Sequence, residues 1–345
     1  MRLALIGFGG VGKAFLRLLQ TKRESLLKEG IDAKVTYILA SRGGLFCPEG
    51  VDTDALFAHL EGGGRVDNFP GFGSPHITPD YLAQNPDGID VAIDLLPTNK
   101  ATGQPGLGCV EKLLDAGVHV ILADKGPAML ACHDLARRAR ARGVQLGLGC
   151  TTGGALPSIN GGIMDLAGAE IQSIEGVLNG TTNFIIQEME ESGCTYEQAL
   201  KKAQDCGIAE TDPSLDVEGW DTAGKLLILT NVLMQEHKTL DDISVTGITG
   251  LTPEQIQAAR AEGKKYKLLG STCRNENGQL VMTVAPCPLS HDHPLFSADG
   301  KNKAVRYTSD TLGDLTVMGG ASGTTPAAAS VLRDLVNIHR GYRFV

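Results

Sequence analysis

The chain has 345 residues, which is enough for two domains, and its 42% hydrophobic and 21% charged residues exclude a wholly disordered protein. Its net charge of −9, from 31 basic and 40 acidic residues, disfavours nucleic acid and anionic membrane surfaces as partners. No apolar run approaches the ~20 residues of a membrane span, so we expect a cytoplasmic protein.

The first third of the chain alternates short apolar or β-branched runs with stretches that have apolar residues at helical spacing. The predicted strands are Arg2 to Ile6, Lys34 to Ala40, Asp90 to Leu96, Val118 to Ala123 and Val144 to Gly149. The predicted helices are Gly10 to Gly30, Leu107 to Ala116 and Ala128 to Gly143, and the Gly- and Pro-rich segment 62–79 is a predicted loop. This alternation predicts βαβ units and a parallel α/β sheet over residues 1–149.

The pattern changes after Gly149. The predicted strands are now Ile171 to Leu178, Leu280 to Val284 and Asp314 to Met318, and the predicted helices are Thr182 to Glu191, Tyr196 to Asp205, Val217 to about Gln235 and Pro326 to about His339. Thr195 and Gln198 form a capping-box signal before the second of these helices. We expect a mixed α+β domain over residues 150–318, with residues 319–345 returning to the first domain.

A glycine-rich turn follows the first predicted strand directly. Gly7-Phe8-Gly9-Gly10-Val11-Gly12 fits G-x-G-x-x-G and opens a predicted helix. In that setting the first glycine allows a tight turn, the second allows backbone to approach a pyrophosphate, and the third allows close packing of helix on strand. The motif predicts a Rossmann-type dinucleotide-binding domain; the alternative is a glycine-rich turn that binds nothing.

An acidic residue at the end of the second strand would hold the ribose of NAD. Asp32 has the usual spacing but precedes that strand, whereas Ser41 and Arg42 stand at its carboxyl end. A hydroxyl and a guanidinium suit a 2′-phosphate, so we expect NADP rather than NAD, although NAD is also possible. Alternatively, Arg42 is a solvated loop residue.

Acidic residues and one lysine are concentrated at the start of the helix predicted from Val217. They are Glu210, Asp216, Glu218, Asp221 and Lys225. Helical spacing would place the last three on one stripe. An exposed stripe of this kind would be an ordinary surface ion pair, but the helix is apolar nearly all round, which is typical of a buried helix. A buried carboxylate and lysine need mutual pairing or a function, and the lysine is suited to proton transfer.

A second lysine, Lys125, follows the predicted strand Val118 to Ala123. The carboxyl end of a strand in a doubly wound sheet is the edge at which ligands bind. Position alone does not separate a ligand-binding lysine from a turn lysine.

Five separated motifs, spread over nearly the whole chain, resemble those of homoserine dehydrogenases. They are Gly7 to Gly12, Ala123-Asp124-Lys125, Asn179-Gly180-Thr181-Thr182-Asn183-Phe184, Glu210 through Lys225, and Gly319 to Gly323 followed by Thr325-Pro326-Ala327. The resemblance implies reversible NAD(P)-linked interconversion of L-homoserine and L-aspartate 4-semialdehyde, on the route to threonine and methionine.

The resemblance also implies roles for particular residues. Lys225 and Lys125 would be the catalytic pair at the reacting oxygen, with Asp221 orienting Lys225 or sharing its proton. The substrate ammonium would bind Glu210 and Asp216, and the same pocket would be lined by Gly180 and Thr181. Members are typically homodimers through the second domain, and we expect this chain to lack the threonine-sensing domain that some members add.

The sequence departs from the usual family pattern at three places. Asp124 stands where an Asn is usual, which adds a negative charge beside Lys125, and Ile208 replaces a Tyr of the pocket. The run Gly149-Cys150-Thr151-Thr152-Gly153 offers no carboxylate where many members bind a monovalent cation. We therefore predict no metal site and regard sodium as doubtful.

Two other functions stay open at this point. The three departures are compatible with a related dehydrogenase for another small hydroxy or amino acid. A nucleotide-binding regulator that senses NADPH without turnover is the alternative from another class, but it would not need Lys225 and Asp221 in a buried helix. The eight cysteines form no Cys-x-x-Cys pair, which favours reduced thiols over disulfides or zinc.

Overall fold

The computed structural model describes residues 1–344, and the chain divides into two compact units. Unit 1 comprises Met1–Ala155 and the segment that begins at Gly323, and unit 2 comprises Leu156–Ser322. The sequence predicted the boundaries between the units at residues 149 and 319. The structure places each boundary a few residues closer to the C-terminus. No helix in the described part of the chain is both long and apolar enough to cross a membrane.

Unit 1 is built on a seven-stranded sheet of order β4-β3-β2-β1-β5-β6-β7. Its parallel strands are β1 (Arg2–Ile6), β2 (Lys34–Ala40), β5 (Val91–Asp94), β6 (His119–Leu122) and β7 (Leu146–Gly147). Its long helices are α1 (Gly10–Lys28), α4 (Gly106–Asp115), α5 (Lys125–Arg142) and α12 (Thr324–His339). The parallel sheet predicted from the alternation of strands and helices is confirmed.

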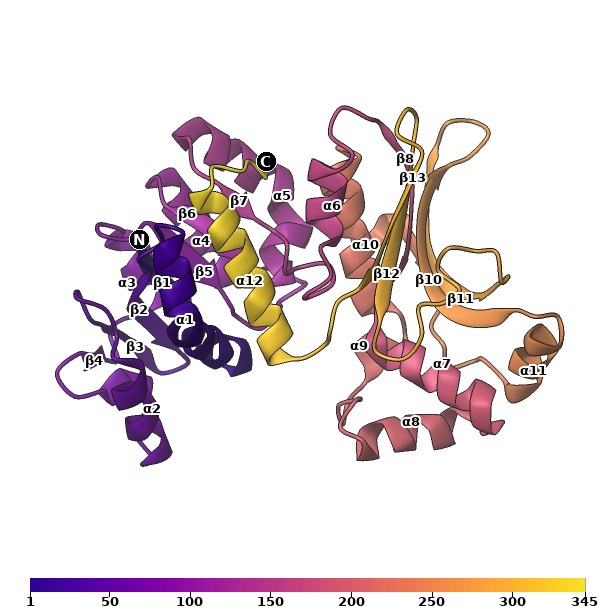
Figure 1. Ribbon diagram of the computed structural model, residues 1–345, viewed down its shortest axis with the longest axis horizontal. Helices are drawn as coiled ribbons and strands as arrows, with labels where there is room; N and C mark the ends of the chain where they lie inside the picture. Colours follow the sequence, from indigo (N-terminus) through magenta and orange to yellow (C-terminus); the bar gives the residue numbers. More distant parts are fainter. Residues whose placement is uncertain (345) are drawn as a thin grey trace. The chain divides into compact units, whose positions relative to one another are not determined.

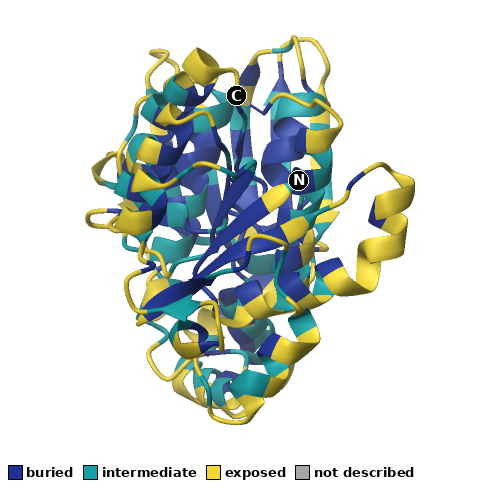
Figure 2. Ribbon diagram, turned by 90° about the vertical axis from the view of Figure 1, so that its left-hand side faces the viewer, coloured by how far each residue is buried: buried dark blue, intermediate teal, exposed yellow. Residues whose placement is uncertain are grey.

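Helices cover the sheet of unit 1, and its central strands are buried. Leu3, Leu5 and Ile6 of β1 are 0% exposed, and Figure 2 shows these strands in dark blue among helices whose outer turns are exposed. Burial on both faces explains why residues 3–6 of β1 and 91–93 of β5 are continuous apolar runs rather than alternating ones.

The segment after β2 has more structure than the sequence indicated. It holds β3 (Gly43–Phe46), β4 (Gly73–Ser74), α2 (Thr53–Glu61), α3 (Pro79–Gln84) and a short 3₁₀ turn at Val66–Asn68. β3 begins with two glycines, which are poor strand formers. They are needed here because a Cβ on Gly43 would lie 2.5 Å from Pro75 Cα and one on Gly44 would lie 2.7 Å from Ile38 O.

The C-terminal helix α12 lies beside α1 and runs parallel to it (Figure 1). Their first turns meet at Gly10 and Thr324, and their last turns meet where Arg340 binds Glu29 at 2.7 Å. The buried Asp334 of α12 accepts a hydrogen bond from Gly149 N at 2.7 Å, which fastens the helix to the end of β7.

Unit 2 is built on a six-stranded sheet of order β13-β12-β8-β10-β11-β9. The strands are β8 (Ile171–Val177), β9 (Ile243–Val245), β10 (Lys265–Arg274), β11 (Leu280–Leu289), β12 (Lys303–Ser309) and β13 (Asp314–Gly319). The helices are α6 (Ser158–Met164), α7 (Gly180–Ser192), α8 (Tyr196–Asp205), α9 (Ser214–Val217), α10 (Trp220–Leu233) and α11 (Pro253–Ala261). Pairing is mainly antiparallel, as in an α+β unit.

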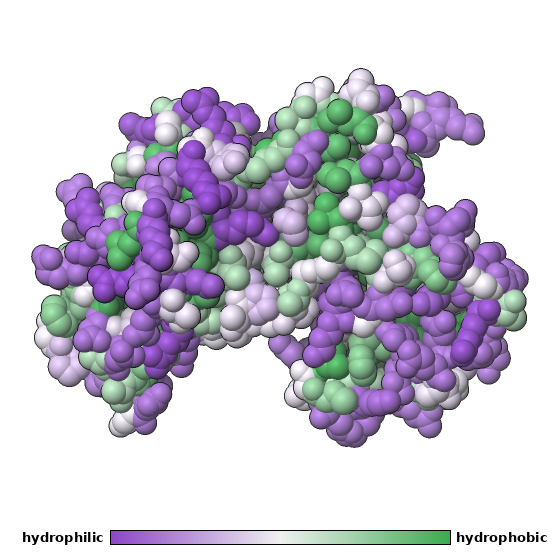
Figure 3. All heavy atoms as spheres, in the orientation of Figure 1, coloured by the Kyte–Doolittle hydropathy of each residue, from purple (hydrophilic) through white to green (hydrophobic). Residues whose placement is uncertain are grey.

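Helices α6 and α10 cover one face of this sheet. Thr230 of α10 shares a hydrogen bond of 2.8 Å with Thr272 of β10, and Tyr307 of β12 donates one of 2.7 Å to Ser158 O of α6. Apolar side chains gather over α6 on the face drawn in Figure 3. On the opposite face of the sheet, Ser271 and Arg306 are only half-buried.

The helix predicted as continuous from Val217 is interrupted. α9 ends at Val217, and Gly219 has a left-handed φ of +90° before α10 begins at Trp220. Glu218 therefore does not lie on the helix of Asp221 and Lys225, and the prediction that all three residues share one helical stripe is wrong for Glu218. Only Asp221 and Lys225 share a helical face.

Candidate active site

The glycine turn of unit 1 has the geometry that its motif predicts. Gly7 has a φ of +109°, and a Cβ there would lie 2.8 Å from Leu95 O. A Cβ on Gly12 would lie 2.7 Å from Gly7 O, so this glycine lets α1 pack closely on the turn. Gly9 differs, because nothing lies within 4 Å of the position of its Cβ. Close packing therefore requires glycine at positions 7 and 12, whereas Gly9 faces open space.

The first turns of α1 and α12 lie together at this glycine turn. A Cβ on Gly10 would lie 2.7 Å from Thr324 Cγ2, and neither first turn has an acidic residue. Helix N-termini carry unpaired N–H groups and partial positive charge. Gly7, Phe8, Gly9, Gly10, Val11 and Gly12 therefore form a backbone cradle that fits a pyrophosphate.

The carboxyl end of β2 presents Ser41 and Arg42, and both side chains are exposed. Asp32 precedes β2, so it lies at the opposite end of the strand. The hydrogen bond from Arg65 lowers the pKa of the Asp67 carboxyl, and the charge of Arg42 adds to that effect. A cationic edge with one hydroxyl results, although Asp67 offsets part of its charge.

In unit 2, Asn179, Asp216, Asp221 and Lys225 form one hydrogen-bonded network. Asn179 Nδ2 donates to Asp216 Oδ1 at 2.6 Å and to Asp221 Oδ2 at 2.8 Å. Lys225 Nζ donates to Asp221 Oδ2 at 2.5 Å and to Leu178 O at 2.8 Å. The side chains of Lys225 and Asp221 are each 13% exposed, so the pair is shielded but reachable. An ion pair this shielded is unlike an exposed surface pair.

Glu210 is placed differently from the other acids. It is exposed in the loop between α8 and α9, where its backbone carbonyl accepts a hydrogen bond from Gln204 at 3.2 Å. Within residues 1–344, no hydrogen bond or ion pair joins its carboxylate to the network.

Gly180 and Thr181 begin α7 directly after Asn179. A Cβ on Gly180 would lie 3.5 Å from Ser322 Oγ, an ordinary contact distance, so this turn lies close to the loop after β13. Thr181 donates a hydrogen bond of 3.3 Å to Ile208 O. Ile208, which the sequence indicated as a departure, thus lies against the first turn of α7.

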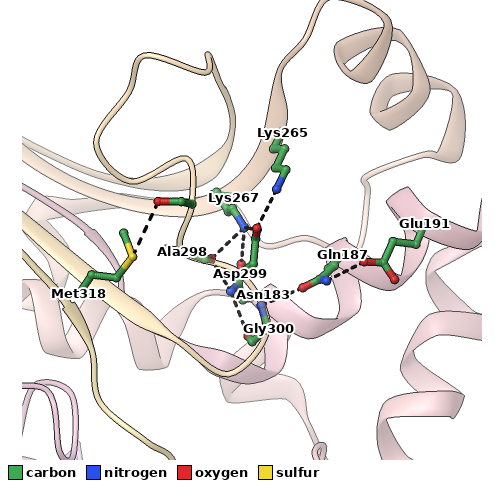
Figure 4. Close-up of polar contacts among 10 residues, drawn as sticks. Asn183, Gln187, Glu191, Lys265, Lys267, Ala298, Asp299, Gly300 and Met318 are labelled. Atoms are coloured by element: carbon green, nitrogen blue, oxygen red, sulfur yellow. Dashed lines mark hydrogen bonds and ion pairs between the residues drawn. The ribbon is translucent and has the colours of Figure 1, made fainter.

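Asn183, the last Asn of the same motif, has a structural role that the sequence did not indicate. Its Nδ2 donates to Ala298 O at 2.7 Å and to Gly300 O at 3.0 Å, and its Oδ1 accepts from the buried Lys267 at 3.0 Å (Figure 4). Lys267 also donates to Asp299 at 2.8 Å. Burial lowers the pKa of Lys267, against the effect of Asp299. This network fastens the loop before β12 to α7.

Lys125 is the first residue of α5, at the carboxyl end of β6, and is half-buried. Its backbone N–H donates to Thr98 Oγ1 at 3.3 Å. Asp124 caps the helix by accepting a hydrogen bond from Gly126 N at 2.9 Å. The structure therefore places Lys125 at the edge of the sheet that the strand pattern predicted.

The bend from Gly149 to Gly153 offers no carboxylate. Thr151 donates its hydroxyl hydrogen bond to Leu148 O at 2.7 Å. Across residues 1–344 no group of three or more His, Cys, Asp or Glu residues is placed to hold a metal ion.

Comparison with known proteins identifies the family. The homoserine dehydrogenase family profile matches residues 157–336, and a homoserine dehydrogenase of Methanocaldococcus jannaschii is 35% identical over 98% of both chains. The chain belongs to the homoserine dehydrogenase family. An NAD(+)-dependent homoserine dehydrogenase of Pseudomonas canavaninivorans is 33% identical over 98% of this chain and 96% of its own.

The solved structures agree with this assignment. A crystal structure of an Archaeoglobus fulgidus protein assigned as a homoserine dehydrogenase superposes with a TM-score of 0.87 at 32% identity, covering 98% of this chain and 99% of that one. The predictions of an enzyme of this family and of its two-part α/β fold are confirmed.

Proposed function

We propose that this enzyme interconverts L-homoserine and L-aspartate 4-semialdehyde with NAD(P), within threonine and methionine biosynthesis. The observation that carries the proposal is the shielded network of Asn179, Asp216, Asp221 and Lys225. Unit 1 binds the dinucleotide through Gly7 to Gly12, and unit 2 binds the amino acid. A bound nicotinamide supplies a hydride acceptor for the carbinol carbon and a hydride donor for the reverse reaction.

Lys225 moves the proton in this mechanism. Its contacts with Asp221 and Leu178 O use two of three ammonium donors, and we assign the third N–H to the substrate oxygen. As a neutral amine, Lys225 accepts the hydroxyl proton during oxidation; as an ammonium, it gives a proton to the aldehyde oxygen during reduction. Asp221 orients Lys225 through their hydrogen bond. We assign Lys125 as the second lysine at the reacting oxygen.

The substrate ammonium binds the acidic residues of unit 2. Asp216 is half-buried beside Asn179, and Glu210 is exposed in the preceding loop. Charge-assisted hydrogen bonds to carboxylates suit a primary ammonium. Gly180 and Thr181 complete the pocket from the first turn of α7.

Replacing Lys225 tests the proposal. We expect Lys225→Ala to lower kcat for homoserine by about 10²- to 10⁴-fold, the range of general acid–base catalysis, measured as the absorbance of the reduced cofactor. Lys201→Ala is the matched control, since Lys201 also forms an i,i+4 ion pair on a helix, with Asp205, but is 70% exposed. Equal activity of the Lys225 variant and the control would refute the assignment.

The cofactor preference rests on the carboxyl end of β2. Because Arg42 is exposed there beside Ser41, we propose that NADP is preferred. Arg42→Ala should lower kcat/KM for NADP about 10- to 100-fold, as for a lost charged hydrogen bond, with little change for NAD. Arg137→Ala, an exposed arginine on α5, is the control. Better use of NAD than NADP by the unmodified enzyme would contradict this preference.

One observation favours a second candidate, a dehydrogenase of another small hydroxy or amino acid. Ile208 lies against Thr181 and offers no side-chain hydrogen bond to a substrate. A panel of hydroxy and amino acids under the same assay distinguishes the two functions, because the better substrate is the one with the higher kcat/KM. Cofactor binding without turnover of any of them would instead indicate a non-catalytic NADPH-binding regulator.

We further propose a homodimer formed through unit 2. The sheet face opposite α6 and α10 carries Val281 and Met318, which are 40% and 39% exposed. Such a half-apolar face suits a second copy of the chain. The molar mass in solution, from light scattering, tests this.

We also propose a cytoplasmic location. All eight cysteines are free, which suits a reducing compartment. Fractionation of cells that produce the protein tests this location.

A further inference from the structure

Two buried carboxyl groups lie together at the carboxyl edge of the unit 1 sheet. Asp94 ends β5 and is 0% exposed, and Asp124 follows β6 and is 2% exposed. The strands are neighbours, and Ala123 N donates to Asp94 O at 2.8 Å. The mechanism proposed above uses neither carboxyl group.

The outer oxygens of the two groups turn toward the same point. A Cβ on Gly106, in the first turn of α4, would lie 2.7 Å from Asp94 Oδ2 and 3.2 Å from Asp124 Oδ2. Because residue 106 is glycine, the two oxygens can occupy this space together. A larger residue there would collide with both carboxyl groups.

Hydrogen bonds from backbone N–H groups satisfy both Oδ1 atoms, whereas Asp94 Oδ2 has no hydrogen bond. Asp94 Oδ1 accepts from Leu96 N at 3.1 Å, and Asp124 Oδ1 accepts from Gly126 N at 2.9 Å. The Thr98 hydroxyl also binds the Asp124 carboxyl. Asp94 Oδ2 is fully buried and has no hydrogen-bond partner. An ionised oxygen in that position would be costly, whereas a protonated one can donate to an acceptor nearby.

The surroundings of Asp94 do not neutralise two negative charges. Burial, and then the charge of Asp124, raise the pKa of Asp94 to about 7, against the hydrogen bond from Leu96 N. Of the neighbouring elements, α4 contributes the Cys109 thiol, whose own pKa burial and Asp94 raise. Lys112 of α4 and Asp80 of α3 act on Cys109 in opposite senses, and Lys125 of α5 acts on Asp124. The charge of Lys125 thus acts on Asp124 rather than on Asp94.

We propose that Asp94 and Asp124 share one proton, held on Asp94 Oδ2 and donated to Asp124 Oδ2, and that Asp94 is thereby a positioning residue for Lys125. The proton leaves one negative charge beside Lys125 and keeps Asp124 in place as the cap of α5. Loss of the proton leaves two buried carboxylates that repel each other. The repulsion weakens the hydrogen bond from Gly126 N to Asp124. The role toward Lys125 rests on the proposed function, whereas the shared proton does not.

Asparagine at either position separates the shared proton from mere burial. In Asp94→Asn the amide donates to the Asp124 carboxylate, and in Asp124→Asn the amide donates to the Asp94 carboxylate. Each variant keeps one hydrogen bond and one carboxyl group but has no second carboxyl group with which to share a proton. Asp90→Asn is the control, because Asp90 is exposed at the other end of β5.

Infrared spectroscopy of the purified protein detects the proton without any turnover. We expect a protonated-carboxyl C=O band near pH 6 that disappears near pH 9, is absent from both Asn variants and persists in Asp90→Asn. Absence of the band from the unmodified protein, or its persistence in Asp94→Asn, would overturn the shared proton.

The pH profile of kcat/KM tests the role toward Lys125. We expect both Asn variants to keep activity near pH 6 within about threefold and to lose one titration step that the unmodified enzyme shows between about pH 6 and 8. Unchanged profiles in variants that lack the band would overturn the positioning role. Failure of the unmodified enzyme to oxidise homoserine would count against the proposed function alone, because the infrared result does not depend on it.

Discussion

Asn179 serves two elements with one amide group. Its Oδ1 accepts from Thr182 N at 2.9 Å and caps α7, while its Nδ2 donates to Asp216 and Asp221. Neither Ser, Thr nor Asp can do both, because only an amide offers an acceptor and a two-hydrogen donor. Asn179 therefore brings two carboxylates together, with a shared donor between them, where they would otherwise repel.

Removing this amide should affect catalysis more than folding. We expect Asn179→Ala to lower kcat/KM for homoserine by about 10- to 100-fold, since a hydrogen bond to a charged group contributes ~1.5–3 kcal/mol. Loss of the cap alone should reduce the free energy of unfolding by ~1 kcal/mol.

Thr195→Ala is the matched control for that prediction. Thr195 caps α8 in the same way, and its hydroxyl also binds the exposed Glu197 carboxyl, but it lies outside the network of Asp216 and Asp221. Both variants should show a similar shift in urea midpoint, and only Asn179→Ala should lose activity. A kinetic loss of equal size in the control would mean that capping, rather than the network, matters.

Single residues also show where sequence interpretation reaches its limit. The motif around Asn179 and the pair Asp221 and Lys225 could be identified because their members lie close together in sequence. The contacts from Asn179 to Asp216 and Asp221 span 37 and 42 residues, so no spacing rule predicts them. The approach of Asp94 and Asp124 to Gly106 could not be predicted for the same reason, because the three residues belong to different elements.

Among the elements, those with strong local signals were predicted best. The capping box at Thr195 fixed the start of α8, and its predicted bounds agree with the structure. The break at Gly219 was missed because the apolar pattern continues through it. Gly219 has a positive φ, and a Cβ there would lie 3.1 Å from Val245 Cγ1, so the turn depends on a tertiary contact.

Strands β10 and β12 were missed for a different reason. Lys267 and Lys303 both point into buried positions, which breaks the alternation of apolar and polar residues. Lys267 is tolerated there because Asn183, Ala298 O and Asp299 satisfy its ammonium. A polar network that forms only in the folded chain thus conceals a strand from pattern analysis.

The glycine turn before α1 allows a test of which glycines serve the fold and which serve a ligand. Gly9 has a φ of −81° and open space at its Cβ position, so Gly9→Ala should leave the melting temperature almost unchanged. The added methyl would occupy the space assigned to the pyrophosphate, and we expect dinucleotide affinity to fall at least about tenfold.

Gly12→Ala provides the contrast. Its Cβ would lie 2.7 Å from Gly7 O, so α1 would have to move, at ~1–3 kcal/mol of stability as for other overpacked sites. Calorimetric titration with NADP and thermal unfolding measure both effects. Unchanged affinity in the Gly9 variant would show that the dinucleotide does not approach this turn.

Over the whole molecule, the order of elements was more predictable than their bounds. The alternation of strands and helices predicted a parallel sheet, and the last helix was expected to return to the first unit, as α12 does beside α1. The changes between units fall at Ala155 and Gly323, after the residues that the change in composition suggested. The chain between them folds as a unit with its own sheet, so composition alone marks its limits only approximately.

The stability of the molecule should depend on pH through Asp94. Its pKa is raised from 3.8 to about 7 in the folded chain. Below about pH 4 the Asp94 carboxyl is protonated in both the folded and the unfolded state, so its stabilising contribution is fully present. Between about pH 4 and 7 only the folded state holds the proton. The free energy of unfolding that Asp94 contributes should therefore fall by up to about 1.4 kcal/mol per pH unit over this range and level off above it.

Urea unfolding of the unmodified protein and of Asp94→Asn at several pH values isolates this effect, because carboxyl groups with lowered pKa, such as Asp134 and Asp242, are common to both. A constant difference between the two proteins from pH 5 to 8 would show that Asp94 is ionised throughout, and a difference that grows with pH in favour of the unmodified protein would reverse its assigned sign.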